Sequence, residues 1–256
     1  MVSTSKSSYD WLFALMSYTG VLGGVFLSQD FVGFFLFWEI MTFASFMMVL
    51  KRNRHESLKY FVLSVIGAYS MLIAIGILYA KTGALDFATI GKVLYMDASL
   101  GTIGTGETAL IFGLLLAAFG VKAGMFPLYV WAPGAYSEND QSYTAFFSGV
   151  LSKAGGVYGF LLLYMLMFYK LYAALGGTFH GHMTFAYIIA WLGAITVVVA
   201  SFLAVLQEDI RKLFAYSSIG QVGYILLAFG IGSGLGFAGG LFTCSATRSS
   251  RASSGW

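Results

Sequence analysis

Three ionisable side chains inside apolar stretches are the residues of this sequence best placed to do chemistry. They are Glu39, Lys122 and Lys153, and each lies well inside a run long enough to cross a bilayer. A charge at that depth costs roughly 2.5–3.5 kcal/mol on insertion scales, and groups of this kind mark ion pathways and proton relays. The trio predicts a protein that moves protons or ions across a membrane.

The surroundings of Lys122 predict a break in its helix. Within FGVKAGMFPLYVWAP, Pro127 follows the lysine by five residues, removes a backbone donor and clashes with the carbonyl of Ala123. A broken helix at membrane depth is tolerated where it lines a cavity, and an ionisable group at the break points to a transport site. We predict that Lys122 is a central protonatable group; the alternative is a kinked helix with a snorkelling lysine.

Lys153 lies in the glycine-rich segment FFSGVLSKAGGVYGF, and its glycines let neighbouring helices approach closely. Ser152 can hydrogen-bond the amine or a water molecule. Burial in apolar surroundings favours the neutral form of an amine, so a buried lysine exchanges protons more readily than one in water. Lys122 and Lys153, joined by water, would form a proton relay in the plane of the membrane.

A pair of opposite charges on consecutive spans offers a switch. Lys59 begins one span and Glu39 lies in the preceding, antiparallel one, so a pair that opens and closes would move charge. Glu39 lies about 16 Å below the end of its helix at 1.5 Å per residue. Lys59 would therefore have to lie deeper than its position indicates, or water would have to bridge the gap. Alternatively, Lys59 snorkels to the interface.

Composition sets the class of protein that must position these residues. Of the 256 residues, 59% are hydrophobic and 10% charged, against about 25% charged in soluble domains. This predicts an all-α polytopic membrane protein, and the net charge of +3 does not suggest a nucleic-acid partner. Cys244 is the one cysteine, and His180 and His182 lack a third ligand, so we expect no disulfide and no metal site. We find no catalytic, haem, iron–sulfur or nucleotide motif and expect no cofactor.

Seven runs are long and apolar enough to span a bilayer: 11–28, 31–50, 58–80, 108–131, 143–169, 184–206 and 213–231. Two basic loops, 51–55 and 211–212, are separated by four spans, so they lie on the same side, which we place in the cytoplasm. The loops 81–107 and 170–183 and the C-terminal tail then lie outside. We expect a short amphipathic segment near 87–94, and an integral, multi-pass protein of the cell (inner) membrane.

Four segments together resemble a known family. They are FWEIMTFASF around Glu39, VKAGMFPLYVWAPGAY around Lys122, SGVLSKAGGVYGF around Lys153, and QEDIRKLFAYSSIGQVGYILLA from Gln207. They resemble the antiporter-like subunits shared by respiratory complex I, membrane-bound hydrogenases and Mrp-type cation/proton antiporters. The resemblance runs from about Trp11 to Phe242.

The resemblance implies about fourteen helices in two inverted five-helix repeats, each with a half-channel and a broken helix. This chain would begin at the fourth helix and end early in the eleventh. Glu39 would be the acid of the fifth helix and Lys59 its paired lysine. Lys122 would be the lysine of the broken seventh helix and Lys153 the bridging lysine of the eighth.

The end of the chain reads differently from the rest. The apolar pattern resumes at Leu235, stops at Phe242 and gives way to TCSATRSSRASSGW, which has no apolar period. We expect residues 1–231 to form a partial antiporter-like transmembrane domain. We expect residues 232–256 to be the start of a truncated span, followed by a disordered or artefactual tail.

The sequence thus predicts a proton-translocating subunit of a redox-driven complex, such as NADH:quinone oxidoreductase or membrane-bound hydrogenase, with sodium as the alternative ion. It would be a non-catalytic subunit without a redox site, embedded in lipid beside neighbouring membrane subunits that supply the energy. Two alternatives stay open: a cation/proton antiporter subunit without redox partners, and a structural membrane scaffold that transports nothing.

Overall fold

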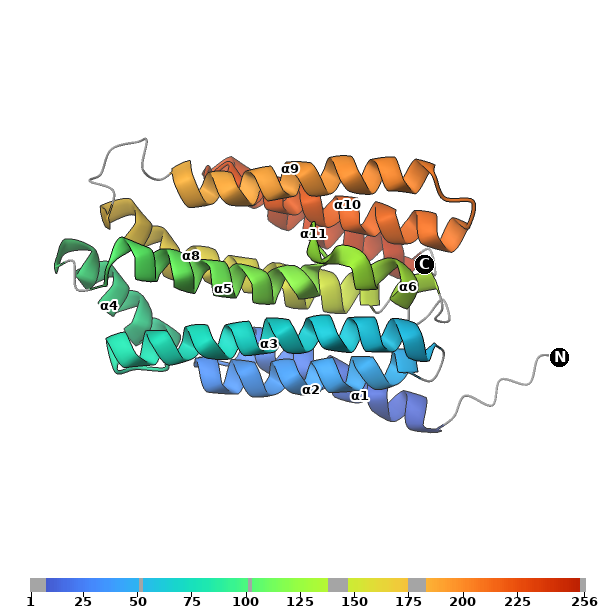
Figure 1. Ribbon diagram of the computed structural model, residues 1–256, viewed down its shortest axis with the longest axis horizontal. Helices are drawn as coiled ribbons and strands as arrows, with labels where there is room; N and C mark the ends of the chain where they lie inside the picture. The colour runs from blue at the N-terminus through green and yellow to red at the C-terminus, as the bar shows by residue number, and fades with distance from the viewer. Residues whose placement is uncertain (1–7, 51–52, 101–102, 138–146, 175–182, 254–256) are drawn as a thin grey trace.

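The computed structural model describes residues 8–50, 53–100, 103–137, 147–174 and 183–253, and nearly all of them are helical (Figure 1). The α-helices are α1 (Ser8–Val21), α2 (Phe31–Leu50), α3 (Arg54–Thr82), α4 (Phe87–Leu100), α5 (Thr105–Ala123), α6 (Ala132–Ser137), α8 (Tyr158–Ala174), α9 (Met183–Val205), α10 (Ile210–Gly230) and α11 (Gly234–Ser253). Two π-helical segments, η1 (Leu22–Leu27) and η3 (Phe147–Val157), and a 3₁₀ turn, η2 (Leu128–Trp131), are the other helical elements of the described residues.

Five stretches of the described residues are long and apolar enough to cross a membrane: Phe31–Leu50, Arg54–Thr82, Gly106–Ser137, Ala186–Val205 and Ile210–Gly230. They coincide with five of the seven predicted runs. The other two runs fall on α1 with η1 and on η3 with α8, where π-helical segments interrupt the α-helices. The predicted all-α, polytopic membrane bundle with one broken helix is confirmed.

The long helices lie side by side along the longest axis of the molecule (Figure 1). Small residues let some of them meet closely, as between α9 and α10: a Cβ added at Gly223 would lie 2.8 Å from the carbonyl oxygen of Gly193. α3 packs against α2 on one side and α5 on the other, and η3 packs against both α5 and α10. The contact between α5 and η3 brings together the two segments that carry the buried lysines.

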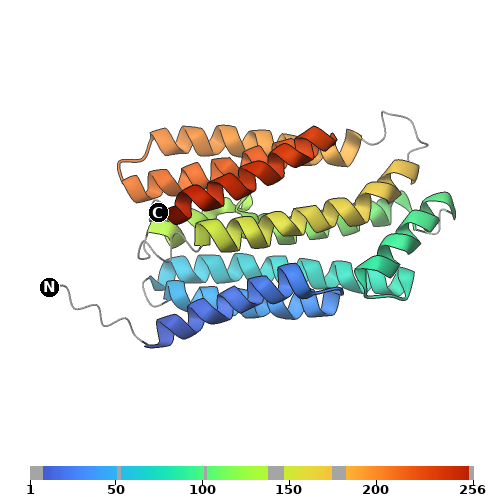
Figure 2. The ribbon, with the colours of Figure 1, turned by 180° about the vertical axis from the view of Figure 1, so that it is seen from behind.

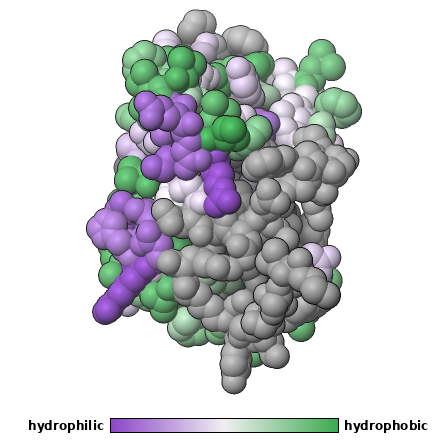
Figure 3. Space-filling view, turned by 90° about the vertical axis from the view of Figure 1, so that its right-hand side faces the viewer, coloured by the Kyte–Doolittle hydropathy of each residue, from purple (hydrophilic) through white to green (hydrophobic). Residues whose placement is uncertain are grey.

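The ends of the helices agree with the predicted grouping of the basic loops. α3 begins at Arg54 and α10 begins at Ile210 at the same end of the bundle (Figure 1). Hydrophilic side chains gather on the described part of that end (Figure 3). At the opposite end the starts of α2 and α4 are joined by an isolated bridge between Asp30 and Asp86. α4 is the helical segment predicted near residues 87–94.

The end of the chain departs from expectation. Residues 234–253 form one helix, α11, which runs back along α10 and η3, so Ser253 lies at the same end as Arg54 and not on the opposite side (Figure 2). Phe237 stacks on Phe229 of α10 with ring centroids 5.0 Å apart. Hydroxyls of the polar run bond to carbonyls of their own helix, as Thr243 Oγ1 does to Gly239 O at 2.8 Å. The polar run is therefore helical as far as Ser253, the last residue that the structure describes, where we expected disorder.

Candidate functional site

The predicted break after Lys122 is present. α5 ends at Ala123, and Gly124 takes a φ of 75°, the left-handed region that glycine adopts without steric cost. The amides of Gly124 and Met125 both return to the carbonyl of Gly120. After Pro127 the chain continues as η2 and α6, so the span is two helical pieces joined at membrane depth.

Three side chains satisfy backbone groups around this break, and none of these bonds was foreseen from the sequence. The bonds are Phe126 N–H to Thr196 Oγ1 of α9 (3.0 Å), Trp131 Nε1–H to Val121 O (2.8 Å) and Ser152 Oγ–H to Ala123 O (2.8 Å). Irregular backbone at membrane depth needs such partners, because lipid supplies none. The break is thus held by α9, η2 and η3 together, and it places the last turn of α5 within the bundle.

Lys122 lies in that last turn, and its side chain is 2% exposed. Its Nζ donates to Tyr60 Oη at 2.7 Å and to Ser64 Oγ at 3.3 Å, both on α3. The ammonium also lies 4.7 Å from the centre of the Tyr60 ring, a distance at which cation–π attraction operates. Sequence reasoning missed Tyr60 and Ser64, although they stand four residues apart and so share one face of α3.

Glu39 lies within electrostatic reach of Lys122. Its carboxylate interacts electrostatically with Lys122 across the bundle, while its Oε1 is buried and has no hydrogen-bond partner. Within the described ranges no direct ion pair joins Glu39 to either lysine. The acid and the amine are therefore close enough to attract each other but are not bonded.

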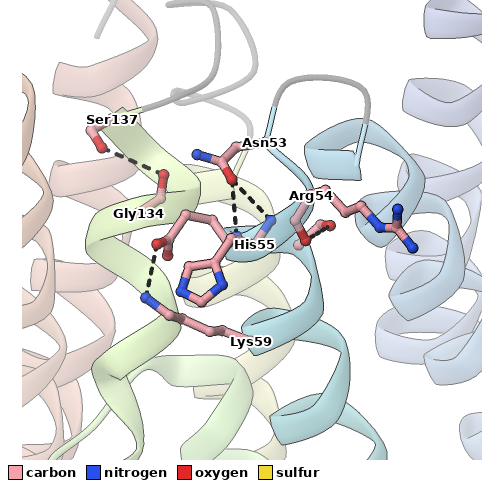
Figure 4. A network of polar contacts seen from close by, with 8 residues as sticks. Asn53, Arg54, His55, Lys59, Gly134 and Ser137 are labelled. Carbon is pink, nitrogen blue, oxygen red and sulfur yellow. Dashed lines mark hydrogen bonds and ion pairs between the residues drawn. The ribbon is translucent and has the colours of Figure 1, made fainter.

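Lys59 pairs within its own helix. Its Nζ lies 2.8 Å from Glu56 Oε1, one turn earlier on α3, and its side chain is 40% exposed (Figure 4). Figure 4 places this pair beside Gly134 of α6, at the end of the bundle where α3 begins. The expected Glu39–Lys59 pair is absent from this structure because Lys59 lies near the start of α3, whereas Glu39 lies in the middle of α2. The snorkelling alternative describes Lys59 better.

Lys153 lies on η3 and is fully buried. Its Nζ donates to Gln221 Oε1 of α10 at 2.6 Å, whereas the hydroxyl of Ser152 turns to the break. A second polar contact joins the same two elements, between Ser148 Oγ and Ser218 Oγ at 2.7 Å. Gln221 belongs to the segment SSIGQ, and nothing in that segment alone indicated that its amide would meet Lys153.

The two lysines are close in the fold but turned apart. η3 packs against the end of α5 so tightly that a Cβ on Gly156 would lie 2.6 Å from the backbone of Ala123, the neighbour of Lys122. Lys122 nevertheless binds α3, and Lys153 binds α10. A proton passing between them would have to cross the α5–η3 contact.

The described residues hold no group of three or more His, Cys, Asp or Glu side chains that could bind a metal ion. His180 and His182 lie outside the described residues. The site consists of two buried amines and one carboxylate, connected to neutral hydroxyl and amide groups. Amines and carboxylates are groups that can bind and release protons.

Comparison with known proteins agrees with this geometry. Residues 28–246 match the family described as "NADH:quinone oxidoreductase/Mrp antiporter, TM". The chain belongs to this family. The predicted resemblance is thereby confirmed, and it covers Glu39, both buried lysines and most of α11.

Family members with similar sequences have different roles. The chain is 31% identical over 228 residues to a Na(+)/H(+) antiporter subunit of Bacillus subtilis, covering 86% of this chain and 42% of that protein. It is 28% identical over 242 residues to an NADH-quinone oxidoreductase subunit of Rhodobacter capsulatus, covering 91% and 45%. The chain therefore spans less than half the length of these relatives.

Two solved structures share the fold. A chain of the membrane-bound sulfane sulfur reductase (MBS), an archaeal respiratory membrane complex, is 62% identical, with a TM-score of 0.86 over 96% of this chain and 39% of that one. A chain of the Mrp complex from Dietzia sp. is 22% identical, with a TM-score of 0.75 over 94% and 42%. All these relatives belong to membrane assemblies of several subunits or are named as subunits.

Proposed function

We propose that this chain is part of an ion-translocating subunit of a redox-driven membrane complex, resident in the cell membrane and contacting other membrane subunits there. The observation that carries the proposal is Lys122: a fully buried amine in the last turn before a helix break, facing the carboxylate of Glu39. A scaffold has no use for such a group, because burying a charge costs free energy. The 62% identity to a chain of a respiratory complex favours a redox-driven assembly.

Each buried charge has a role in this proposal. Lys122 is the central group that takes up and releases the ion, and Lys153 connects it laterally to the next site. Glu39 is the acid of the switch, with Lys122 as its partner in place of Lys59. Protons suit the site better than sodium, because the site contains two amines: an amine binds a proton directly, whereas a protonated amine repels a sodium ion, and hard cations prefer oxygen ligands.

The test uses Lys122 variants in the full-length, assembled complex, with proton uptake measured in inverted membrane vesicles. Lys122→Ala should abolish most of the uptake, and Lys122→Arg should impair it, because arginine effectively never loses its proton. Lys92→Ala is the matched control, since Lys92 is exposed on α4. Near-normal uptake by assembled Lys122→Ala complex would refute the proposal.

A second candidate is a cation/proton antiporter that works without redox partners, and the 31% identity to an antiporter subunit favours it. The same vesicle assay distinguishes the antiporter from the redox-driven complex. Uptake that starts only when an electron donor and acceptor are supplied supports the redox-driven complex. Exchange of protons for sodium in either direction, driven by a gradient alone, supports the antiporter.

A further inference from the structure

Tyr60 is a buried titratable residue to which the proposed function assigns no role. Its side chain is 1% exposed, and its hydroxyl oxygen lies 2.7 Å from Lys122 Nζ and 2.6 Å from Ser45 Oγ. Ser45 lies on α2, the helix of Glu39, and its hydroxyl lies 2.7 Å from the carbonyl of Met41, to which it donates. The Tyr60 hydroxyl therefore links the helix that carries the central lysine to the helix that carries the acid.

The position of the Tyr60 ring is fixed by the helix break. The ring packs against Trp131 with centroids 4.8 Å apart, and the Trp131 indole donates to the carbonyl of Val121, the residue before Lys122. Ser64, one turn further along α3, supplies a second oxygen 3.3 Å from the amine. The Lys122 amine therefore binds two neutral hydroxyls, and the contact of Tyr60 with Trp131 fixes the position of the Tyr60 hydroxyl relative to the Lys122 backbone.

These hydroxyls and the Glu39 carboxylate are partners of different kinds. An ionised carboxylate only accepts hydrogen bonds, so it attracts a protonated lysine strongly but has no proton to donate to the lone pair of a neutral one. A hydroxyl accepts from an ammonium and can turn to donate to an amine. The hydroxyl position therefore suits Lys122 both before and after it gives up a proton. In the structure Lys122 occupies this position, while Glu39 Oε1 has no hydrogen-bond partner.

We propose that Tyr60, together with Ser64, is a positioning residue that holds Lys122 away from Glu39 while the amine exchanges its proton. The inference rests on the proposed function, in which Lys122 carries the ion. Glu39 on α2 and Lys153 on η3 are the other charged groups of the site, and Gln221 holds Lys153. Without the hydroxyl, the protonated lysine would turn to Glu39 and stay there as an ion pair.

The test compares Tyr60→Phe in two backgrounds, in the assembled complex and by the same vesicle assay. In the natural background, loss of a hydrogen bond to a charged group should lower proton uptake on the order of tenfold. In a Glu39→Gln background no carboxylate captures the lysine. Adding Tyr60→Phe there should lower uptake by less than about twofold relative to Glu39→Gln alone. Tyr69→Phe is the matched control, because Tyr69 lies on α3 with 63% of its side chain exposed.

A purely structural role for Tyr60 would give the same loss in both backgrounds, and that result would overturn the inference. Unchanged uptake in Tyr60→Phe alone would overturn it too. If Tyr60→Phe does not assemble, Ser64→Ala replaces it, with a smaller loss expected from the longer bond and the same dependence on Glu39. Normal uptake by Lys122→Ala would instead defeat the proposed function itself, so the two failures are distinguishable.

Discussion

Replacing Thr196 by valine tests whether α9 holds the helix break in place. Thr196 is fully buried, and its Oγ1 accepts the Phe126 N–H at 3.0 Å while donating to Leu192 O at 2.6 Å. Valine has nearly the same shape but no hydroxyl. Leu192 O keeps its place in the α9 helix, so the cost comes from Phe126, whose amide would lose its partner beside the break.

A buried polar group left without a partner costs about 1–3 kcal/mol. If this free energy destabilises only the conformation in which the helix break holds Lys122 in its observed position, the population of that conformation falls by about 5- to 150-fold. We therefore expect Thr196→Val to lower both the thermal midpoint of the purified complex and its rate of proton uptake. Thr196→Ser keeps the hydroxyl and should restore most of both.

Thr42→Val is the matched control. Thr42 is 2% exposed, and its hydroxyl donates to Trp38 O within α2 at 2.8 Å. Among the residues that the structure describes, no amide of another element donates to this hydroxyl. The same substitution there removes the same atoms from a buried helix without opening the break. Equal midpoints and equal uptake for Thr196→Val and Thr42→Val would refute the reasoning that the α9 hydroxyl secures the break.

Two further predictions concern the coupling between Lys59 and Glu39 and the packing of η3 on α5. Lys59→Gln should change proton uptake little, because the exposed ion pair of Lys59 with Glu56 contributes about 0–1 kcal/mol. In the double variant, the effects of Lys59→Gln and Glu39→Gln on uptake should add. A coupling energy above about 0.5 kcal/mol would show that the two residues interact, against this prediction. Gly156→Ala puts a Cβ against the backbone of Ala123 and should lower the stability of the folded subunit by about 1–3 kcal/mol, measured as a smaller amount of assembled subunit in membranes. Gly76→Ala is the control, because a Cβ at Gly76 meets no atom within 4 Å. Equal amounts of the two variants would contradict the packing of η3 on α5.

Features that depend on a short stretch of sequence could be predicted. The length and composition of an apolar run decide whether it can cross a bilayer, so the all-α class and five of the seven predicted runs agree with the described structure. Pro127 lacks a backbone donor wherever it stands, and the break follows from that. A lysine in the middle of such a run, as at positions 122 and 153, is costly whatever surrounds it, so both were identified as functional candidates.

The partners of these residues depend on how the helices pack. Lys122 donates a hydrogen bond to Tyr60 because α3 packs against α5, and Lys153 donates to Gln221 because α10 packs against η3. The sequence of an apolar run does not indicate which helix its serine, tyrosine or glutamine side chains will contact. The expected contact of Glu39 with Lys59 is not formed in this structure: the two residues lie on consecutive helices, but Lys59 lies near the start of α3 and pairs with Glu56, whereas Glu39 lies in the middle of α2.

The sequence alone determined which side chains lie inside the membrane, because the penalty for burying a charge and the need to satisfy backbone groups act on each segment by itself. Only the tertiary structure decided which of them touch, since a lysine finds its acceptor through the approach of two or three helices. α11 shows the same division: its polar residues predicted no span, and the contact of Phe237 with Phe229 places it beside α10.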